Sequence, residues 1–302
     1  MKFLLFADLH YAPGTFMGGT WEILREIQAY AEREGCDFII HAGDFCHGPT
    51  NVADYVKAYN DFHIPSYHCL GNHDADKTPF EETVRLYNMP NEYYYFDCKG
   101  YRMIVLNPNY YKDGEELVNF SMGNYFKFGP YRDWVPQAQL AWLKDTIASS
   151  PYPCLLISHE SFERPDGVQN RDEVLAIINE ANAKKPHSVL MCMNGHYHRD
   201  YIRILDNVCY FDVNSVKFDW VEKVHDLYPE DRCAQIKHLN HTVVYNDPLY
   251  CVVTLTGNTI EIKGKESSMF MGVTREMTGN IKYDKAGRPV VPRIASTKIT
   301  LD

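Results

Sequence analysis

Residues 64–74 read IPSYHCLGNHD, an apolar and β-prone run followed directly by Gly71, an amide, an imidazole and a carboxylate. The composition of the run predicts a buried strand, and the glycine permits a tight turn at its end. A single tetrapeptide of this kind carries little weight alone. It becomes informative if other predicted strands end in the same chemical types.

Through the first ninety residues, short apolar runs alternate with segments whose apolar residues recur at helical spacing. Strands are predicted at residues 2–8, 36–44 and 64–74, each followed by an amphipathic helix, at residues 21–34, 52–62 and 78–88. This alternation predicts parallel strands with right-handed crossovers, an arrangement that binds ligands at the carboxyl ends of its strands. The third helix should begin with a capping box formed by Thr78 and Glu81, with Pro79 at the first helical position.

From residue 93 the pattern changes to hairpins and bare apolar strands. Turns at 99–100, 206–207 and 257–258 predict hairpins, residues 153–160 and 188–198 read as strands ending in polar residues, and residues 135–148 and 172–185 read as helices. We expect one domain over 1–302, built of two packed sheets with helices outside. The metal motifs lie within 8–198, residues 199–263 should complete the second sheet, and 264–302 is a C-terminal extension that packs on the surface or on a second subunit of a homo-oligomer. Residues 108–134 are aromatic-rich and without clear period, which is typical of a functional lip.

The composition excludes several classes of protein. Of the 302 residues, 45% are hydrophobic and 23% charged, as in ordinary globular proteins, and the formal net charge is -10. The chain has no basic run, which argues against dedicated nucleic-acid binding. Nine scattered cysteines without a C-x-x-C pair favour a reducing compartment, and no signal-peptide core or membrane span is evident. We therefore expect a cytoplasmic protein without membrane partners.

Five predicted strands end in the same chemical types. These residues are Asp8 and His10, then Asp44, then Asn72, His73 and Asp74, then His159, and finally His196 and His198. Residues i and i+2 of a strand share a face, so Asp8 with His10, and His196 with His198, should each converge on one ion. Mixed imidazole and carboxylate donors suit Mn, Fe or Zn better than Mg or Ca. The set fits two divalent ions about 3.5–4 Å apart, the spacing of two-metal phosphoryl-transfer sites.

In this order, the motifs D-x-H, G-D, G-N-H-D, H and G-H-x-H resemble the signature of the calcineurin-like metallophosphoesterase superfamily, over residues 8–198. The resemblance implies an α/β fold, a four-layer α/β/β/α sandwich, around a dinuclear metal centre. It implies that Asp8, His10 and His198 hold one ion, that Asn72, His159 and His196 hold the other, and that Asp44 bridges them. It further implies in-line attack by a metal-bridging hydroxide, with His73 as proton donor to the leaving group and Asp74 setting its tautomer and charge.

Differences between this sequence and the motifs of particular subfamilies narrow the range of expected substrates. Phosphoprotein phosphatases of this superfamily carry arginines after both the G-D and the G-N-H motif, whereas this chain reads GDFCHG and GNHDADK. The remaining similarity is to bacterial phosphodiesterase-like and nucleotide-pyrophosphatase-like members. We therefore expect a hydrolase of small phosphodiesters or nucleotides. The alternatives are a phosphomonoesterase, a non-catalytic scaffold that keeps the fold, or a DNA nuclease, which the acidic balance disfavours. Further site candidates are His47 near the metals and, for substrate stacking, Tyr110, Tyr111, Tyr125 and Phe126.

Overall fold

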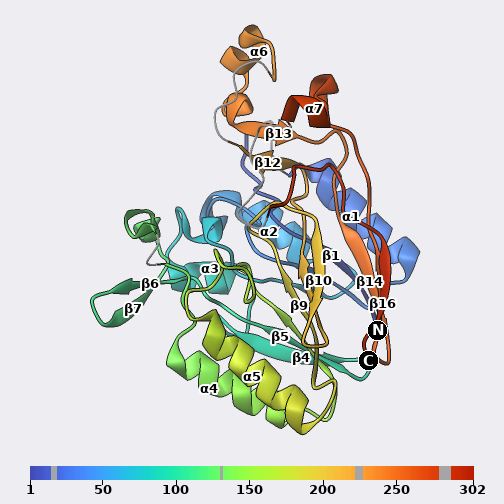
Figure 1. Ribbon diagram of the computed structural model, residues 1–302. Coiled ribbons are helices and arrows are strands. Elements are labelled where there is room, and N and C mark those ends of the chain that lie inside the picture. The colour runs from blue at the N-terminus through green and yellow to red at the C-terminus, as the bar shows by residue number, and fades with distance from the viewer. Residues whose placement is uncertain (15–18, 130–131, 222–226, 279–286) are drawn as a thin grey trace.

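The computed structural model describes residues 1–14, 19–129, 132–221, 227–278 and 287–302, and two six-stranded sheets form its centre (Figure 1). In spatial order, the first sheet consists of β16 (Thr297–Thr300), β15 (Thr259–Lys263), β14 (Cys251–Thr256), β1 (Lys2–Phe6), β2 (Phe38–His41) and β3 (Ser66–Tyr67). The second consists of β10 (Tyr201–Leu205), β11 (Val208–Asp212), β9 (Val189–Asn194), β8 (Cys154–Ile157), β5 (Tyr101–Val105) and β4 (Tyr94–Cys98).

Each sheet has a parallel centre. β1, β2 and β3 run parallel in the first sheet, and β5, β8, β9 and β11 run parallel in the second. Antiparallel strands flank both centres, β14 beside β1 and β4 and β10 at the two edges of the second sheet. The carboxyl ends of the parallel strands therefore gather the loops that carry the predicted ligands.

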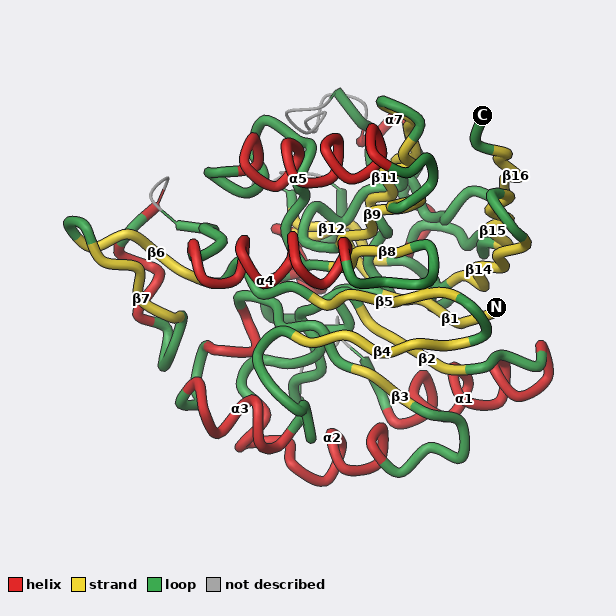
Figure 2. The backbone as a smooth tube through the Cα atoms, turned by 90° about the horizontal axis from the view of Figure 1, so that it is seen from below, coloured by secondary structure: helices red, strands yellow, loops and turns green. Residues whose placement is uncertain are grey.

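The two sheets pack face to face, with helices covering their outer faces (Figure 2). Leu5 and Ile40 of the first sheet share one buried apolar cluster with Met103, Ile157 and Met193 of the second. The helices α1 (Trp21–Glu34), α2 (Ala53–Asn60) and α3 (Phe80–Leu86) pack on the first sheet, and α4 (Gln137–Ala148) and α5 (Arg171–Lys184) on the second. The predicted four-layer α/β/β/α sandwich is confirmed.

Smaller elements lie around these layers. They are β6 (Tyr110–Asp113) and β7 (Glu116–Asn119), β12 (Phe218–Trp220) and β13 (Thr242–Val244), the helices α6 (Glu230–Gln235) and α7 (Arg275–Thr278), and the 3-10 turns η1 (Pro49–Val52), η2 (His73–Ala75), η3 (Asn124–Lys127), η5 (Leu239–His241) and η6 (Phe270–Gly272). The segment 108–134 is thus partly regular, a hairpin and a 3-10 turn, although residues 130–131 lie outside the described part. None of the described helices has the length and apolar character that crossing a membrane requires.

The C-terminal third departs from expectation. β10 and β11 extend the second sheet as predicted, but β14 and β15 belong to the first, because β14 pairs with β1 from Lys2 opposite Thr254. β16 of the C-terminal extension then pairs with β15. The extension therefore completes a sheet of its own chain. All three expected hairpins are present, with residues 99, 100, 206, 207 and 257 in the left-handed region that tight turns require.

The capping box predicted for α3 is wrong. The helix begins at Phe80 with Pro79 as its N-cap residue and no side-chain cap. The Thr78 hydroxyl instead accepts a hydrogen bond from the Thr50 amide at 3.2 Å and donates one to the Thr50 hydroxyl at 3.0 Å. The contact with η1 uses the oxygen that would have capped the helix.

Candidate metal centre

Tight loops, rather than the strands themselves, bring the predicted ligands together. β1 ends at Phe6 and β9 at Asn194, so the i, i+2 strand argument for the two histidine motifs is wrong. The backbone instead turns through the left-handed region at five of the predicted ligands, with φ between 49° and 69° at Asp8, His10, Asp44, His196 and His198. Such conformations cost about 1–3 kcal/mol each for residues other than glycine, and they concentrate at functional sites.

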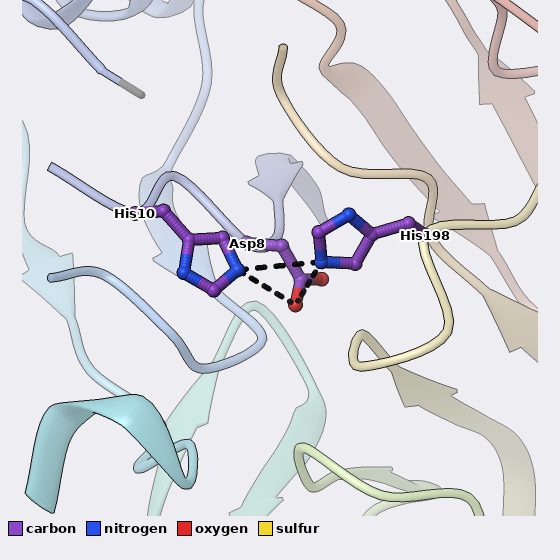
Figure 3. A group of neighbouring side chains, drawn as sticks. All are labelled: Asp8, His10 and His198. Atoms are coloured by element: carbon purple, nitrogen blue, oxygen red, sulfur yellow. Dashed lines mark hydrogen bonds and ion pairs between the residues drawn. The ribbon is translucent and has the colours of Figure 1, made fainter. Parts of the chain in front are cut away.

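Asp8, His10 and His198 form one compact group (Figure 3). His198 Nε2 lies 3.2 Å from Asp8 Oδ1 and 3.3 Å from His10 Nε2, and the His10 Nε2–Asp8 Oδ1 distance is 3.9 Å. All three side chains are almost fully buried. The backbone amide of His196 donates to both Asp8 oxygens, at 3.2 and 3.0 Å, which ties the loop after β9 to the loop after β1.

Asp44 lies between this group and a second one. Its Oδ2 is 3.7 Å from His10 Nε2 on one side and 3.1 Å from His159 Nε2 on the other. In the second group, His196 Nδ1 lies 3.1 Å from the side-chain oxygen of Asn72. The chain thus brings all seven predicted ligands (Asp8, His10, Asp44, Asn72, His159, His196 and His198) into one cluster, in which His196 is half-buried and the others are buried.

The tautomers of two histidines show that these donors fit cations. The Nδ1–H groups of His159 and His198 donate to the backbone carbonyls of Ala42 and Phe218, both at 2.7 Å. The Nε2 lone pair of each imidazole then faces a carboxylate oxygen, of Asp44 and Asp8 respectively, at 3.1 and 3.2 Å. Two buried acceptors this close repel one another unless a cation or a proton lies between them. Imidazole nitrogens oriented in this way suit divalent transition metals.

Three glycines, Gly43, Gly71 and Gly195, make the close approach possible. A Cβ atom at Gly71 would meet the amide nitrogen and Oδ1 of Asp44 at 2.2 Å. One at Gly195 would meet Asp8 Oδ2 at 2.6 Å, and one at Gly43 would meet the His159 ring at 2.3 Å. Each glycine therefore packs directly on a predicted ligand.

Comparison with known proteins agrees with this geometry. The family model for calcineurin-like phosphoesterases matches residues 1–200. The chain belongs to this family. It is a metal-dependent phosphoester hydrolase, and the family and the buried donor set indicate two divalent ions.

Two curated relatives of this phosphoesterase are plant proteins. They come from Arabidopsis thaliana and Oryza sativa subsp. japonica, and each is named a manganese-dependent ADP-ribose/CDP-alcohol diphosphatase. Both are 24% identical to this chain, in alignments that cover 66% of it and 80% and 77% of the relatives. Because these relatives are not bacterial, the expected bacterial branch stays a prediction.

Solved structures show the same fold. A dimetal phosphatase from Danio rerio has a TM-score of 0.62 and 14% identity, covering 100% of this chain and 99% of that one. GAP50, the anchor in the inner membrane complex of Plasmodium, has a TM-score of 0.53 and 13% identity, covering 100% and 89%. At these identities the likeness concerns the fold alone.

The role expected for Asp74 in this phosphoesterase is wrong. Its carboxylate is fully buried and accepts hydrogen bonds from the backbone amides of Gly71, Asp44 and Cys46, at 2.8, 3.1 and 3.1 Å, and from the Tyr87 hydroxyl at 2.5 Å. Four donors occupy both oxygens, so Asp74 holds two ligand loops together and does not touch the His73 ring.

The partner of His73 is Asp76, which the sequence interpretation missed. Asp76 Oδ2 lies 2.8 Å from His73 Nδ1, because residues 73–75 form the 3-10 turn η2 and bring positions i and i+3 onto one face. Burial alone would lower the pKa of His73, but the charge of Asp44 and the hydrogen bond to Asp76 outweigh it and raise the pKa above its ordinary value. In the sequence, the second acid of the H-D-A-D stretch at residues 73–76 indicated that Asp76 could pair with His73.

Asp76 also connects His47 and the aromatic lip to the site. Its Oδ2 lies 3.0 Å from His47 Nδ1, and its Oδ1 accepts from the Tyr125 hydroxyl at 2.5 Å. Burial alone would raise the pKa of Asp76. The hydrogen bonds from His47 and His73 outweigh the effect of burial and lower this pKa to about 2. The Tyr125 oxygen in turn accepts from the Asn72 amide nitrogen at 3.3 Å, which leaves the Asn72 oxygen free to face His196.

Among the described residues, the other lip aromatics form no hydrogen bond or ring contact with the predicted ligands. Tyr110 donates to Glu92 at 2.6 Å, and Tyr111 stacks on Phe128 with ring centroids 3.8 Å apart. Phe126 is 62% exposed and stacks on Tyr125. Tyr125 is therefore the member of the predicted set that reaches the site, and it does so through its hydroxyl group.

Replacing Asp74 with Asn should lower the free energy of unfolding of the metal-free protein by about 2–4 kcal/mol. An asparagine would turn an NH₂ group toward backbone N–H donors and leave some of them unpaired in a buried site. Urea denaturation measures the loss, with Asp145→Asn, at an exposed position on α4, as the matched control. Unchanged stability of Asp74→Asn would contradict the anchoring role.

Proposed function

We propose that the protein hydrolyses small nucleotide-type phosphodiesters, with pyrophosphate-linked molecules such as ADP-ribose and CDP-alcohols as the leading candidates. The observation that carries the proposal is the His73–Asp76 pair beside seven candidate ligands, because a leaving-group acid next to two metal sites is what phosphoester hydrolysis requires. The names of the two plant relatives support the choice of substrate.

We assign the ligands to two sites. Asp8, His10 and His198 hold one ion, Asn72, His159 and His196 hold the other, and Asp44 lies between them. Manganese is the leading candidate metal because both curated relatives depend on it. When bound, the ions polarise the phosphoryl oxygens and lower the pKa of water to about 7.

The charges of the site explain how an acidic protein can hold a phosphate group. Two divalent ions set against the carboxylates of Asp8 and Asp44 leave about +2 at one point of a chain whose formal charge is -10. The remaining ligands are neutral imidazoles and one amide. The charge of the loaded metal centre would therefore be positive although the net charge of the chain is negative.

His73 is placed to donate a proton to the leaving oxygen. Its Nδ1 faces Asp76, so the Nε2 of the imidazolium carries the proton that can be transferred. Its backbone amide donates to Asp44 Oδ1 at 2.8 Å, which fixes the residue next to the proposed bridging position. The side chain is 25% exposed, so a substrate can reach it.

We also place the protein in the cytoplasm. All nine cysteines are free thiols, and most of them are buried. This supports a reducing compartment, where thiols of this kind persist.

The test is a hydrolysis panel run on the purified protein with Mn, Fe, Zn and Mg. It compares ADP-ribose and CDP-alcohols with cyclic nucleotides and with phosphomonoesters. We expect kcat/KM for the pyrophosphates to exceed that for monoesters at least about tenfold, or about 1.4 kcal/mol of transition-state binding. Asp44→Asn protein, purified in parallel, controls for contaminating enzymes. Faster monoester hydrolysis would instead indicate a phosphomonoesterase, and no hydrolysis of any compound on the panel would contradict the proposed substrate class.

A further inference from the structure

We infer that Glu160 is an additional ligand of the ion held by Asn72, His159 and His196. Glu160 follows His159 directly in the loop after β8, and its side chain is 1% exposed. With His159 and His196 it forms a group whose ligand atoms all lie within 4.8 Å of one another. The inference rests on the metal assignment of the proposed function but not on the choice of substrate.

The carboxylate points into the site without a partner of its own. Its Oε1 lies 3.9 Å from His196 Nδ1, and neither oxygen has a hydrogen-bond partner elsewhere among the described residues. No described Lys or Arg forms an ion pair with Glu160 either. A buried carboxylate left in this state is strongly unfavourable, and a bound cation relieves the cost.

Among the described residues, each of the other buried acids has at least one hydrogen-bond donor or arginine as a partner, which makes Glu160 stand out. Asp212 is fully buried and bridges Arg164 at 3.0 Å and Arg203 at 2.9 Å. Asp74 accepts from four donors. Asp133 has one unpaired oxygen, but its other oxygen lies 3.5 Å from Arg132. Among the buried carboxylates that the structure describes, Glu160 thus stands out as having no hydrogen-bond donor, arginine or lysine on either oxygen, and an ion in the second site would take that place.

The loop holds Glu160 in this position. The Ser158 hydroxyl donates to the Glu160 carbonyl at 2.6 Å, and the neighbouring His159 ring is fixed by its hydrogen bond to Ala42. A third carboxylate lowers the charge of the two-ion centre from about +2 to about +1. It also shifts the second site toward oxygen donors, which favours Mn over softer ions.

Glu160→Gln tests the inference because it keeps the shape of the side chain and removes its charge. Metal-free protein is titrated with Mn(II), and free Mn is followed by electron paramagnetic resonance. One of the two equivalents should bind as in the wild type, whereas affinity for the other should fall at least about tenfold. Glu163→Gln is the matched control, since Glu163 lies on the same segment but pairs with Arg203. Unchanged affinity for both equivalents would overturn the inference.

Thermal unfolding separates a ligand from a structural carboxyl group. Without metal, Glu160→Gln should be as stable as the wild type or more stable, because no unpaired charge is buried, while the gain in Tm on adding Mn should shrink. A lower Tm without metal, together with an unchanged gain, would indicate a structural role and overturn the inference.

A crystal structure of the wild-type protein grown with Mn gives a test that needs no variant. A Glu160 oxygen should lie about 2.2 Å from the second ion, and a distance beyond about 3 Å would overturn the inference. All three measurements omit substrate. A protein that hydrolyses nothing on the panel could therefore still satisfy them, and failure of the proposed function remains distinguishable from failure of this inference.

Discussion

Asp44→Asn should leave the protein with fewer than two equivalents of metal and should lower kcat/KM by more than about 10³-fold, or roughly 4 kcal/mol of transition-state stabilisation. Asp44 lies between the two groups of ligands, 3.7 Å from His10 Nε2 and 3.1 Å from His159 Nε2. The substitution removes one of the two central negative charges. It also replaces an oxygen with an NH₂ group, which cannot donate a lone pair to a metal.

The fold should survive this change. The asparagine oxygen can still accept the hydrogen bond that the His73 amide donates to Asp44 Oδ1 at 2.8 Å. Elemental analysis after dialysis gives the metal content, and circular dichroism confirms the fold. Asp54→Asn, an exposed site on α2, serves as the matched control and should keep both ions. Two full equivalents of metal in Asp44→Asn would refute the bridging assignment.

The sequence predicted the layers, and which side chains gather at the strand ends, because both follow from local pattern. Helix α1 occupies the predicted residues 21–34, since its apolar residues recur at helical spacing and Gly35 in the left-handed region ends it. The order of the five motifs placed the site at the strand ends. The helix and each motif can be recognised from residues that are close together in the sequence.

Side-chain pairing was harder to predict because it depends on turn geometry. Asp74 is adjacent to His73 in sequence, but the 3-10 turn directs the two side chains apart and brings Asp76 to the imidazole instead. The sequence does not single out Glu160 for a related reason. A single Glu after a histidine matches no sequence motif. Glu160 becomes a candidate ligand because its carboxylate is buried without a hydrogen-bond partner, which only the packed structure reveals. The placement of β14 beside β1 likewise depends on contacts some 250 residues apart in sequence.

His73→Ala should separate catalysis from metal binding. Both ions should remain, because His73 is not one of the seven assigned ligands, while turnover of substrates with poor leaving groups should fall by about 10²–10⁴-fold, or about 3–5 kcal/mol of barrier. A nitrophenolate leaves without protonation, so p-nitrophenyl diesters should lose less than about tenfold. Elemental analysis and the ratio of kcat for alkyl and p-nitrophenyl diesters are the measurements. His63→Ala, an exposed histidine, is the control.

Asp76→Asn should reproduce part of this pattern and add a pH signature. A general acid must be protonated, so kcat falls as the pH rises through its pKa, on the alkaline limb of the profile. The Asp76 carboxylate helps to raise the pKa of His73, against the effect of burial. Its removal lowers that pKa, and the alkaline limb should therefore move to lower pH. Equal losses for good and poor leaving groups in His73→Ala would mean that His73 acts on the phosphoryl oxygens instead. Loss of metal from that variant would show that the ligand assignment omits it.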